Sequence, residues 1–331
     1  MTSYLRNSIL ATIVYYDIFD YPLTLLEVYK FLINPGRVVR VTGGLGEIDL
    51  GDVLKEIRDL VKSGILGQKN GFYFLSSHDN LYGLRINNQK ITDQKWKKFL
   101  KVVKFLALAP YLRGVFASGS MALGNTTEES DFDVLIIAKP GRLYTCRLFL
   151  WLISSLLGVR RKKNEKIAPD KLCFNHYITE DNLALVHRSL FNAQTYINLK
   201  PAMIKPELID KFYISNLWLN DYAYNFKVQK DFTRRNINTP RFFKFLAKIG
   251  EFILDVSLGD WFEELSKHRQ QKLIRNNPIT YRSGGRITFN NKELEFHPHS
   301  FEKVVVEEYG KGIRRVGVVP YVEERDSGLS R

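Results

Sequence analysis

The stretch GVFASGSMALGNTTEESDFDVLIIA, residues 114–138, decides the fold of this chain. Its two apolar runs predict strands, the first leading into Gly119-Ser120 and the second beginning with Asp131 and Asp133. Residues two apart on a strand point to the same face, so both carboxylates project together while the phenylalanine between them faces the other side. The stretch therefore predicts a pair of acids beside a glycine-containing turn.

The acid pair predicts a site for a divalent cation. Hard oxygen ligands without accompanying His or Cys suit Mg²⁺ or Mn²⁺, and Mg²⁺ typically takes one or two carboxylates together with phosphate oxygens of a substrate. Gly119 permits close approach of the backbone, and the following amides and the Ser120 hydroxyl can hold a phosphate. The alternative is an ordinary turn, but the full spacing together with the apolar strand favours a functional site.

The spacing of SGS at 118–120 and SDFDV at 130–134 resembles the signature of the DNA polymerase β-like nucleotidyltransferase superfamily. The resemblance is close over residues 114–137 and implies a small α/β core. The order of segments, a winged-helix-like front, this core and a helical C-terminal part, also resembles prokaryotic nucleotidyltransferase-domain proteins. Neither resemblance names an acceptor.

The resemblance carries roles onto four residues. Gly119 and Ser120 would contact the nucleoside triphosphate, and Asp131 and Asp133 would bind Mg²⁺ or Mn²⁺. Apart from the resemblance, Arg142 and Arg147 at the start of the following helix are weaker candidates for contacts with the triphosphate.

The strand predicted next, LCFNHYI at 172–178, lacks the third acid that the superfamily usually supplies. Asn175 or His176 stands at that place, and we assign Asn175 to the catalytic set. Three interpretations stay open: a neutral ligand or a His base, an acid borrowed from Asp181, or no catalysis. In-line phosphoryl transfer relies mainly on positioning and charge stabilisation, which favours an active enzyme.

The chain divides into three predicted domains within an α/β (α+β) fold class. Residues 1–90 predict helices closed by a hairpin, a winged helix-turn-helix-like unit. Residues 91–200 form the nucleotidyltransferase core, a mixed sheet with helices. Residues 201–331 are mainly helical with one hairpin at RITFNNKELEFH.

Local signals support the first of these domains. Thr24 and Glu27 form a capping box, apolar residues at helical spacing predict a helix over 49–63, and Asn70-Gly71 is a strong hairpin signal. The acid content of helix 49–63 argues against operator binding, because phosphate contacts supply most of the affinity for DNA. Substrate positioning is the alternative role.

Composition excludes several classes of protein. With 331 residues and 45% hydrophobic residues, the chain is too long for one small module and too apolar to be disordered. Its two cysteines, Cys146 and Cys173, exclude a disulfide framework and favour the cytoplasm. The longest apolar run, residues 148–159, is too short for a membrane span, which needs about 20 residues.

The net charge of +14 favours a polyanionic partner. Two basic clusters are candidates for phosphate contacts, the lysines between Lys95 and Lys104 and the run Arg160–Lys163; a solvated surface is the alternative for both. The pair His297 and His299 is interpreted as structural, because zinc requires further ligands.

The sequence thus predicts a metal-dependent nucleotidyltransferase that moves a nucleoside monophosphate from an NTP, such as ATP, to an acceptor. The charge favours RNA, for example a tRNA end, as the acceptor. The alternatives are a small, aminoglycoside-like acceptor, and a non-catalytic nucleic-acid-binding or regulatory protein that retains the fold.

Overall fold

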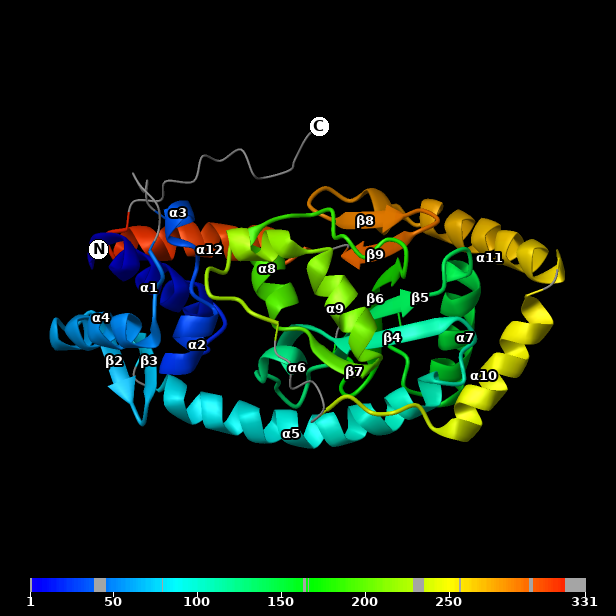
Figure 1. Ribbon diagram of the computed structural model, residues 1–331, viewed down its shortest axis with the longest axis horizontal. Helices are drawn as coiled ribbons and strands as arrows, with labels where there is room; N and C mark the ends of the chain where they lie inside the picture. The colour runs from blue at the N-terminus through cyan, green and yellow to red at the C-terminus, as the bar shows by residue number, and fades with distance from the viewer. Residues whose placement is uncertain are drawn as a thin grey trace.

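The computed structural model describes residues 2–38, 46–78, 80–162, 165, 167–228, 235–255, 257–297 and 300–318. The predicted α/β class is confirmed: a six-stranded mixed sheet carries helices on both faces, and a smaller helical unit with a three-stranded sheet lies at one end (Figure 1).

The N-terminal unit combines helices with a small sheet of strand order β1-β3-β2. Its elements are α1 (Thr2–Asp17), β1 (Leu23–Thr24), α2 (Leu25–Lys30), α3 (Pro35–Val38), α4 (Leu50–Lys62), β2 (Leu66–Lys69) and β3 (Phe72–Leu75). Thr24 and Asp49 each begin a helix with a capping box. The hairpin turns at Asn70 and Gly71, both with positive φ. The helices and the hairpin agree with the sequence, while the winged-helix interpretation stays a prediction.

The central sheet has the strand order β7-β4-β5-β6-β9-β8. Its strands are β4 (Leu112–Ala117), β5 (Phe132–Ala138), β6 (Leu172–Thr179), β7 (Lys200–Ile204), β8 (Arg286–Phe289) and β9 (Glu293–His297). Strands β5 and β6 are parallel and α7 (Leu143–Leu156) crosses between them, whereas the other neighbours are antiparallel. The predicted mixed sheet and the hairpin at 286–297 are therefore present, and the hairpin joins this sheet.

Strand β7 is a difference from the sequence prediction, which described residues 201–331 as mainly helical with a single hairpin. Lys200–Ile204 instead pairs with β4 at the edge of the sheet. The strand is short and contains Pro201, which an edge strand tolerates because one side needs no ladder hydrogen bonds. Neither feature produces a clear strand pattern in the sequence.

The remaining helices lie around the central sheet. They are α5 (Leu81–Leu106), α6 (Gly119–Leu123), α8 (Leu190–Ile197), α9 (Pro206–Ile214), η1 (Leu217–Asp221), α10 (Arg241–Leu254), α11 (Ser257–Arg275), η2 (Pro278–Tyr281) and α12 (Glu302–Arg315). The C-terminal α12 returns to pack along α1 (Figure 1). None of the described helices is long and apolar enough to cross a membrane.

The sheet separates two apolar clusters. Phe132 and alternate residues of β5 pack with α5 and α7, whereas Leu135 and Ile137 face the other way and join the core that contains α1, α2, α4, α8 and α9. The N-terminal unit and one face of the sheet thus share a single core.

The three-domain division stays a proposal. Residue 90 lies inside α5, which runs along both parts of the molecule (Figure 1), and strands from beyond residue 285 complete the central sheet. The ends of the proposed domains therefore do not coincide with the ends of these elements.

The lysines between Lys95 and Lys104 do not form one basic surface, because Lys95 faces inward. Its side chain is buried, and its ammonium group donates hydrogen bonds to Glu128 O at 2.9 Å, Ser130 O at 2.8 Å and Asp170 Oδ1 at 2.8 Å. The helical period turns Lys95 inward, between Trp96 and Thr92, while Lys97 and the lysines beyond it stay exposed. Lys95 thus fixes the loop that leads into the acid pair.

We expect Lys95→Ala to lower the free energy of unfolding by about 2 kcal/mol, because it leaves buried acceptors without a charged donor. Lys101→Ala, on an exposed position of the same helix, should change it by less than about 0.5 kcal/mol. Chemical denaturation of both variants measures the difference. Equal stability of the two variants would show that the buried ammonium does not hold the loop.

Candidate active site

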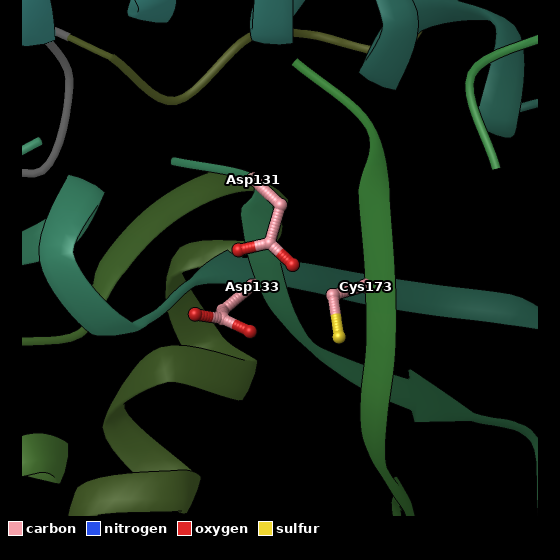
Figure 2. A group of neighbouring side chains, drawn as sticks. All are labelled: Asp131, Asp133 and Cys173. Carbon is pink, nitrogen blue, oxygen red and sulfur yellow. The ribbon is translucent and has the colours of Figure 1, made fainter. Parts of the chain in front are cut away.

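The antiparallel pairing of β4 with β5 brings the glycine turn to the acid pair. Ala117 lies opposite Val134, and the amide of Ser118 donates to the carbonyl of Asp133 at 2.9 Å. Figure 2 shows the carboxylates of Asp131 and Asp133 close together, with Cys173 beside them on the neighbouring strand. The structure therefore brings together the two segments of the sequence motif.

Gly119 is required by this approach. Its φ is +61°, and a Cβ at this position would lie 2.5 Å from Asp133 Oδ2. Gly119 and Ser120 begin the short helix α6, whose first-turn amides have no partner within the helix. Gly119 is exposed and Ser120 partly buried, so both face a space that a phosphate can reach.

The next strand adds an amide to the carboxylates. Cys173 lies opposite Asp133 in the parallel pair, and the register then shifts before His176 reaches Leu135. This shift gives β6 one more residue than β5, as in a β-bulge, a device that commonly re-aims a side chain beside an active site. Asn175 lies at the shift and donates from Nδ2 to Asp133 Oδ1 at 2.9 Å.

Cys173 is a neighbour that the sequence analysis did not assign to the site. Its sulfur and one oxygen of each aspartate all lie within 4.8 Å of one another. Burial and the charges of Asp133 and Asp131 raise the pKa of the Cys173 thiol well above its usual range, so the sulfur stays protonated. Alternation along a strand parallel to β5 is the signal that would have found it.

Arg161 supplies the cation of the site. Its Nη1 donates to Asp131 Oδ2 and lies 4.0 Å from Cys173 Sγ, while Nε and Nη2 donate to the carbonyl of Glu165 at 3.3 and 3.2 Å. The predicted basic run thus has one member on the acid pair. Arg160 instead contacts Ser155 and the ring of Trp151, and Lys163 lies outside the described residues.

The electrostatics of the pair are unfavourable without a cation. Burial, and then the charge of Asp131, raise the pKa of Asp133 to about 7, although Arg161 and Asn175 favour its ionised form. Two carboxylates this close repel each other in surroundings of low dielectric. A positive group between them is therefore strongly favoured.

The donor set fits a hard divalent cation. Carboxylate oxygens are the ligands that Mg²⁺ and Mn²⁺ prefer, and a guanidinium already lies against Asp131. Among the described residues this is the sole group of three or more His, Cys, Asp or Glu side chains close enough to hold an ion. Asp131 and Asp133 are its candidate ligands.

Two other candidates on β6 and after it are engaged elsewhere. The ring nitrogens of the buried His176 lie 3.0 Å from Glu293 Oε1 and 3.3 Å from the Tyr196 hydroxyl. Asp181 accepts from Thr179 and pairs with Lys292. The structure does not bring either residue to the acid pair.

The predicted arginines of α7 also lie away from the acid pair. Arg147 donates to Gln270 at 2.5 Å and stacks over Phe296, and Arg142 pairs with Asp260 at 2.7 Å. Gln270 and Asp260 lie on α11 and Phe296 lies on β9, and no local sequence pattern predicts that these elements pack beside α7. His297 lies 3.5 Å from Glu295, and His299 lies outside the described residues.

Residues 96–178 match the family model described as the nucleotidyltransferase domain. The chain therefore contains a nucleotidyltransferase domain, consistent with the DNA polymerase β-like superfamily, and this domain supports nucleotidyl transfer in general with an NTP as substrate. The searches of curated proteins and of solved structures gave no match.

The raised pKa of Asp133 predicts a stability effect that depends on pH. Between about pH 4 and pH 7 the folded state holds a proton on this carboxyl that the unfolded state has released. The ionised carboxyl therefore lowers the free energy of unfolding. This loss is at its full size above about pH 7 and is absent below about pH 4. In EDTA, Asp133→Asn should melt about 2 °C above the wild type at pH 8, with a smaller gap at pH 5.

Asp170→Asn is the control of opposite sign. Burial raises the pKa of Asp170, but the hydrogen bonds of Lys95 and Lys98 outweigh it and lower this pKa overall. The variant should therefore melt below the wild type at pH 8. An Asp133→Asn variant that is less stable at pH 8 would contradict the account of repulsion in the pair.

Arg161 and a divalent cation should compete for Asp131. Arg161→Gln removes the positive charge, so Mn²⁺ should bind about tenfold more tightly in the absence of nucleotide. Arg161→Lys keeps the charge and should change the affinity little. Calorimetric titration with Mn²⁺ measures both, and weaker binding to Arg161→Gln would show that Arg161 supports the metal site rather than occupying it.

Proposed function

We propose that the protein is a metal-dependent nucleotidyltransferase that transfers a nucleoside monophosphate from an NTP to an acceptor hydroxyl. The observation that carries the proposal is the convergence of Asp131, Asp133 and Asn175 next to Gly119, with a guanidinium already paired to Asp131. Asp131 and Asp133 would hold Mg²⁺ or Mn²⁺, which when bound would neutralise charge on the triphosphate.

The reaction is an in-line displacement at the α-phosphorus. The acceptor oxygen forms a bond to this phosphorus, the bond to the bridging oxygen of the β-phosphate breaks, and pyrophosphate leaves with the electron pair. The hydroxyl proton passes to solvent. Gly119 and Ser120 orient the triphosphate through the first-turn amides of α6, and Arg161 can turn from Asp131 toward the phosphates.

Asn175 takes the place of the third carboxylate. Its hydrogen bond orients Asp133 without adding a negative charge. The site therefore carries one charge less than the usual three-acid site, which weakens the hold on metal and leaves proton removal to water. Positioning and charge stabilisation still support transfer, since they supply most of the catalysis in this chemistry.

The acceptor we propose is an RNA end, such as that of a tRNA, and the location we propose is the cytoplasm. The net charge of +14 and the exposed lysines of α5 support the first. The free cysteines, Cys146 and Cys173, support the second. The small-molecule acceptor is the second candidate, favoured by the burial of Lys95, which removes one lysine from the basic surface.

Transfer of label from an α-labelled NTP to total RNA, with Mg²⁺ or Mn²⁺, tests the proposal. Asp131→Asn should reduce transfer by more than about 100-fold while the protein stays folded, because it removes one of the two carboxylates proposed to bind the metal. Asn175→Asp should tighten metal binding or raise the rate, because it restores the third acid.

Asn175→Ala is the matched control for the last variant, since it removes the hydrogen bond to Asp133 without adding charge. It should leave metal affinity unchanged or lower it. Full transfer by Asp131→Asn would show that the acid pair is not the site, and absence of transfer by the wild type with every NTP would favour the non-catalytic alternative.

A further inference from the structure

A cavity lies at the C-terminal end of α6, the helix that begins with Gly119. It has a volume of about 310 Å³, and Ala122, Leu123 and Gly124 at the end of α6 line it. Because α6 has five residues, its two ends are about 7 Å apart. The cavity size is at the lower end of small-molecule sites.

The walls of this cavity carry more positive than negative charge. Helices α2, α5 and α6 and strand β7 together provide eight of its thirteen lining residues, so the N-terminal unit and the central sheet both contribute. Its charged lining residues are four cations, Lys30, Arg85, Lys200 and Arg235, and one carboxylate, Glu27.

Arg85 has a donor that lacks a partner. Its side chain is buried, with 6% exposed, and Nη2 donates to Glu27 Oε1 at 2.7 Å. The guanidinium lies 3.6 Å above the ring of Tyr21. Its Nη1 is buried and has no hydrogen-bond partner among the described residues. Leaving a charged donor unpaired is costly, so Arg85 adds positive charge that Glu27 alone does not fully satisfy to the wall of the cavity.

Two lysines add to the positive charge of the cavity wall. In the described parts of the chain, the ammonium groups of Lys30 and Lys200 have neither a salt bridge nor a hydrogen bond, although both side chains are partly buried. Burial and then the charges of Lys30 and Arg235 lower the pKa of Lys200 to about 8. An anion would relieve this crowding of cations.

Lys200 links the cavity to the catalytic strands. It lies opposite Ala117 in the β4–β7 pair. Ala117 is two residues before Gly119 in the chain. A ligand in the cavity is therefore held by the same strands and helix that present the Gly-Ser turn.

We propose that this cavity binds a phosphate group of the acceptor, and this proposal rests on the function proposed above. A phosphate offers several acceptor oxygens to the cationic side chains that line the cavity, and its double negative charge matches their excess of positive charge better than a carboxylate does. The volume admits a sugar phosphate or one terminal nucleotide. The acceptor is thus a phosphate-bearing molecule, free or at the end of an RNA chain.

Calorimetric titration of the full chain in EDTA with inorganic phosphate and with adenosine monophosphate tests the cavity without metal or NTP. Lys30→Met and Lys200→Met should each weaken binding by about ten- to hundredfold, as expected for loss of one charge-assisted contact. Lys211→Met, an exposed lysine on α9, is the matched control and should bind like the wild type. Failure of the wild type to bind either probe, or equal affinity of all variants, overturns the proposal.

The source of the phosphate is separated by comparing adenosine monophosphate with a short oligoribonucleotide that carries or lacks a terminal phosphate. Tighter binding of the phosphorylated oligonucleotide than of the mononucleotide assigns an RNA end, and the reverse assigns a small acceptor. Either order supports a phosphate-binding cavity; indifference to the terminal phosphate contradicts it.

The cavity and the proposed function can fail separately. Asp131→Asn should keep phosphate binding, because the acid pair lies outside the cavity. If Lys200→Met loses phosphate binding but no NTP supports transfer by the wild type, the cavity stands as an anion site and its role for an acceptor is overturned. If Asp131→Asn abolishes transfer while Lys200→Met leaves phosphate affinity and the KM of the acceptor unchanged, the function stands and the cavity proposal is wrong.

Discussion

The repulsion between Asp131 and Asp133 is the constraint on which the site depends. Their strand spacing and the burial beside Gly119 hold two carboxylates together, and the pKa of Asp133 rises to about 7 as a result. Arg161 forms an ion pair with Asp131, and Asn175 donates a hydrogen bond to Asp133. We propose that a divalent cation binds this pair in place of the guanidinium, because it neutralises two carboxylates better than a single positive charge does.

The rest of the fold keeps this pair in place. Lys95 ties α5 to the loop before Asp131, and the apolar residues of β5 divide between two cores on opposite faces of the sheet. One of these cores includes the N-terminal unit, so that unit packs against the central sheet and is not a separate appendage. The cationic cavity lies where the two meet, so under our proposal the N-terminal unit takes part in binding the acceptor.

Local signals predicted much of this structure. The capping box at Thr24, the Asn70-Gly71 turn and the alternation around Asp131 depend on neighbours in the chain, and all appear as expected. Contacts between distant segments were not predictable in this way. They include the pairing of β7 at the edge of the sheet, the burial of Lys95 against Asp170 and the hydrogen bond from Arg147 to Gln270 of α11. The pairing of Arg161 with Asp131 needed the register of β6, which the sequence alone does not define.

The location of Mn²⁺ in crystals soaked with this ion tests the central claim most directly. Anomalous scattering should place the ion between the carboxylates of Asp131 and Asp133, with Arg161 turned away from Asp131. Full Mn²⁺ loading with Arg161 still paired to Asp131 and no anomalous peak at the acid pair would contradict the claim that these carboxylates form a cation site.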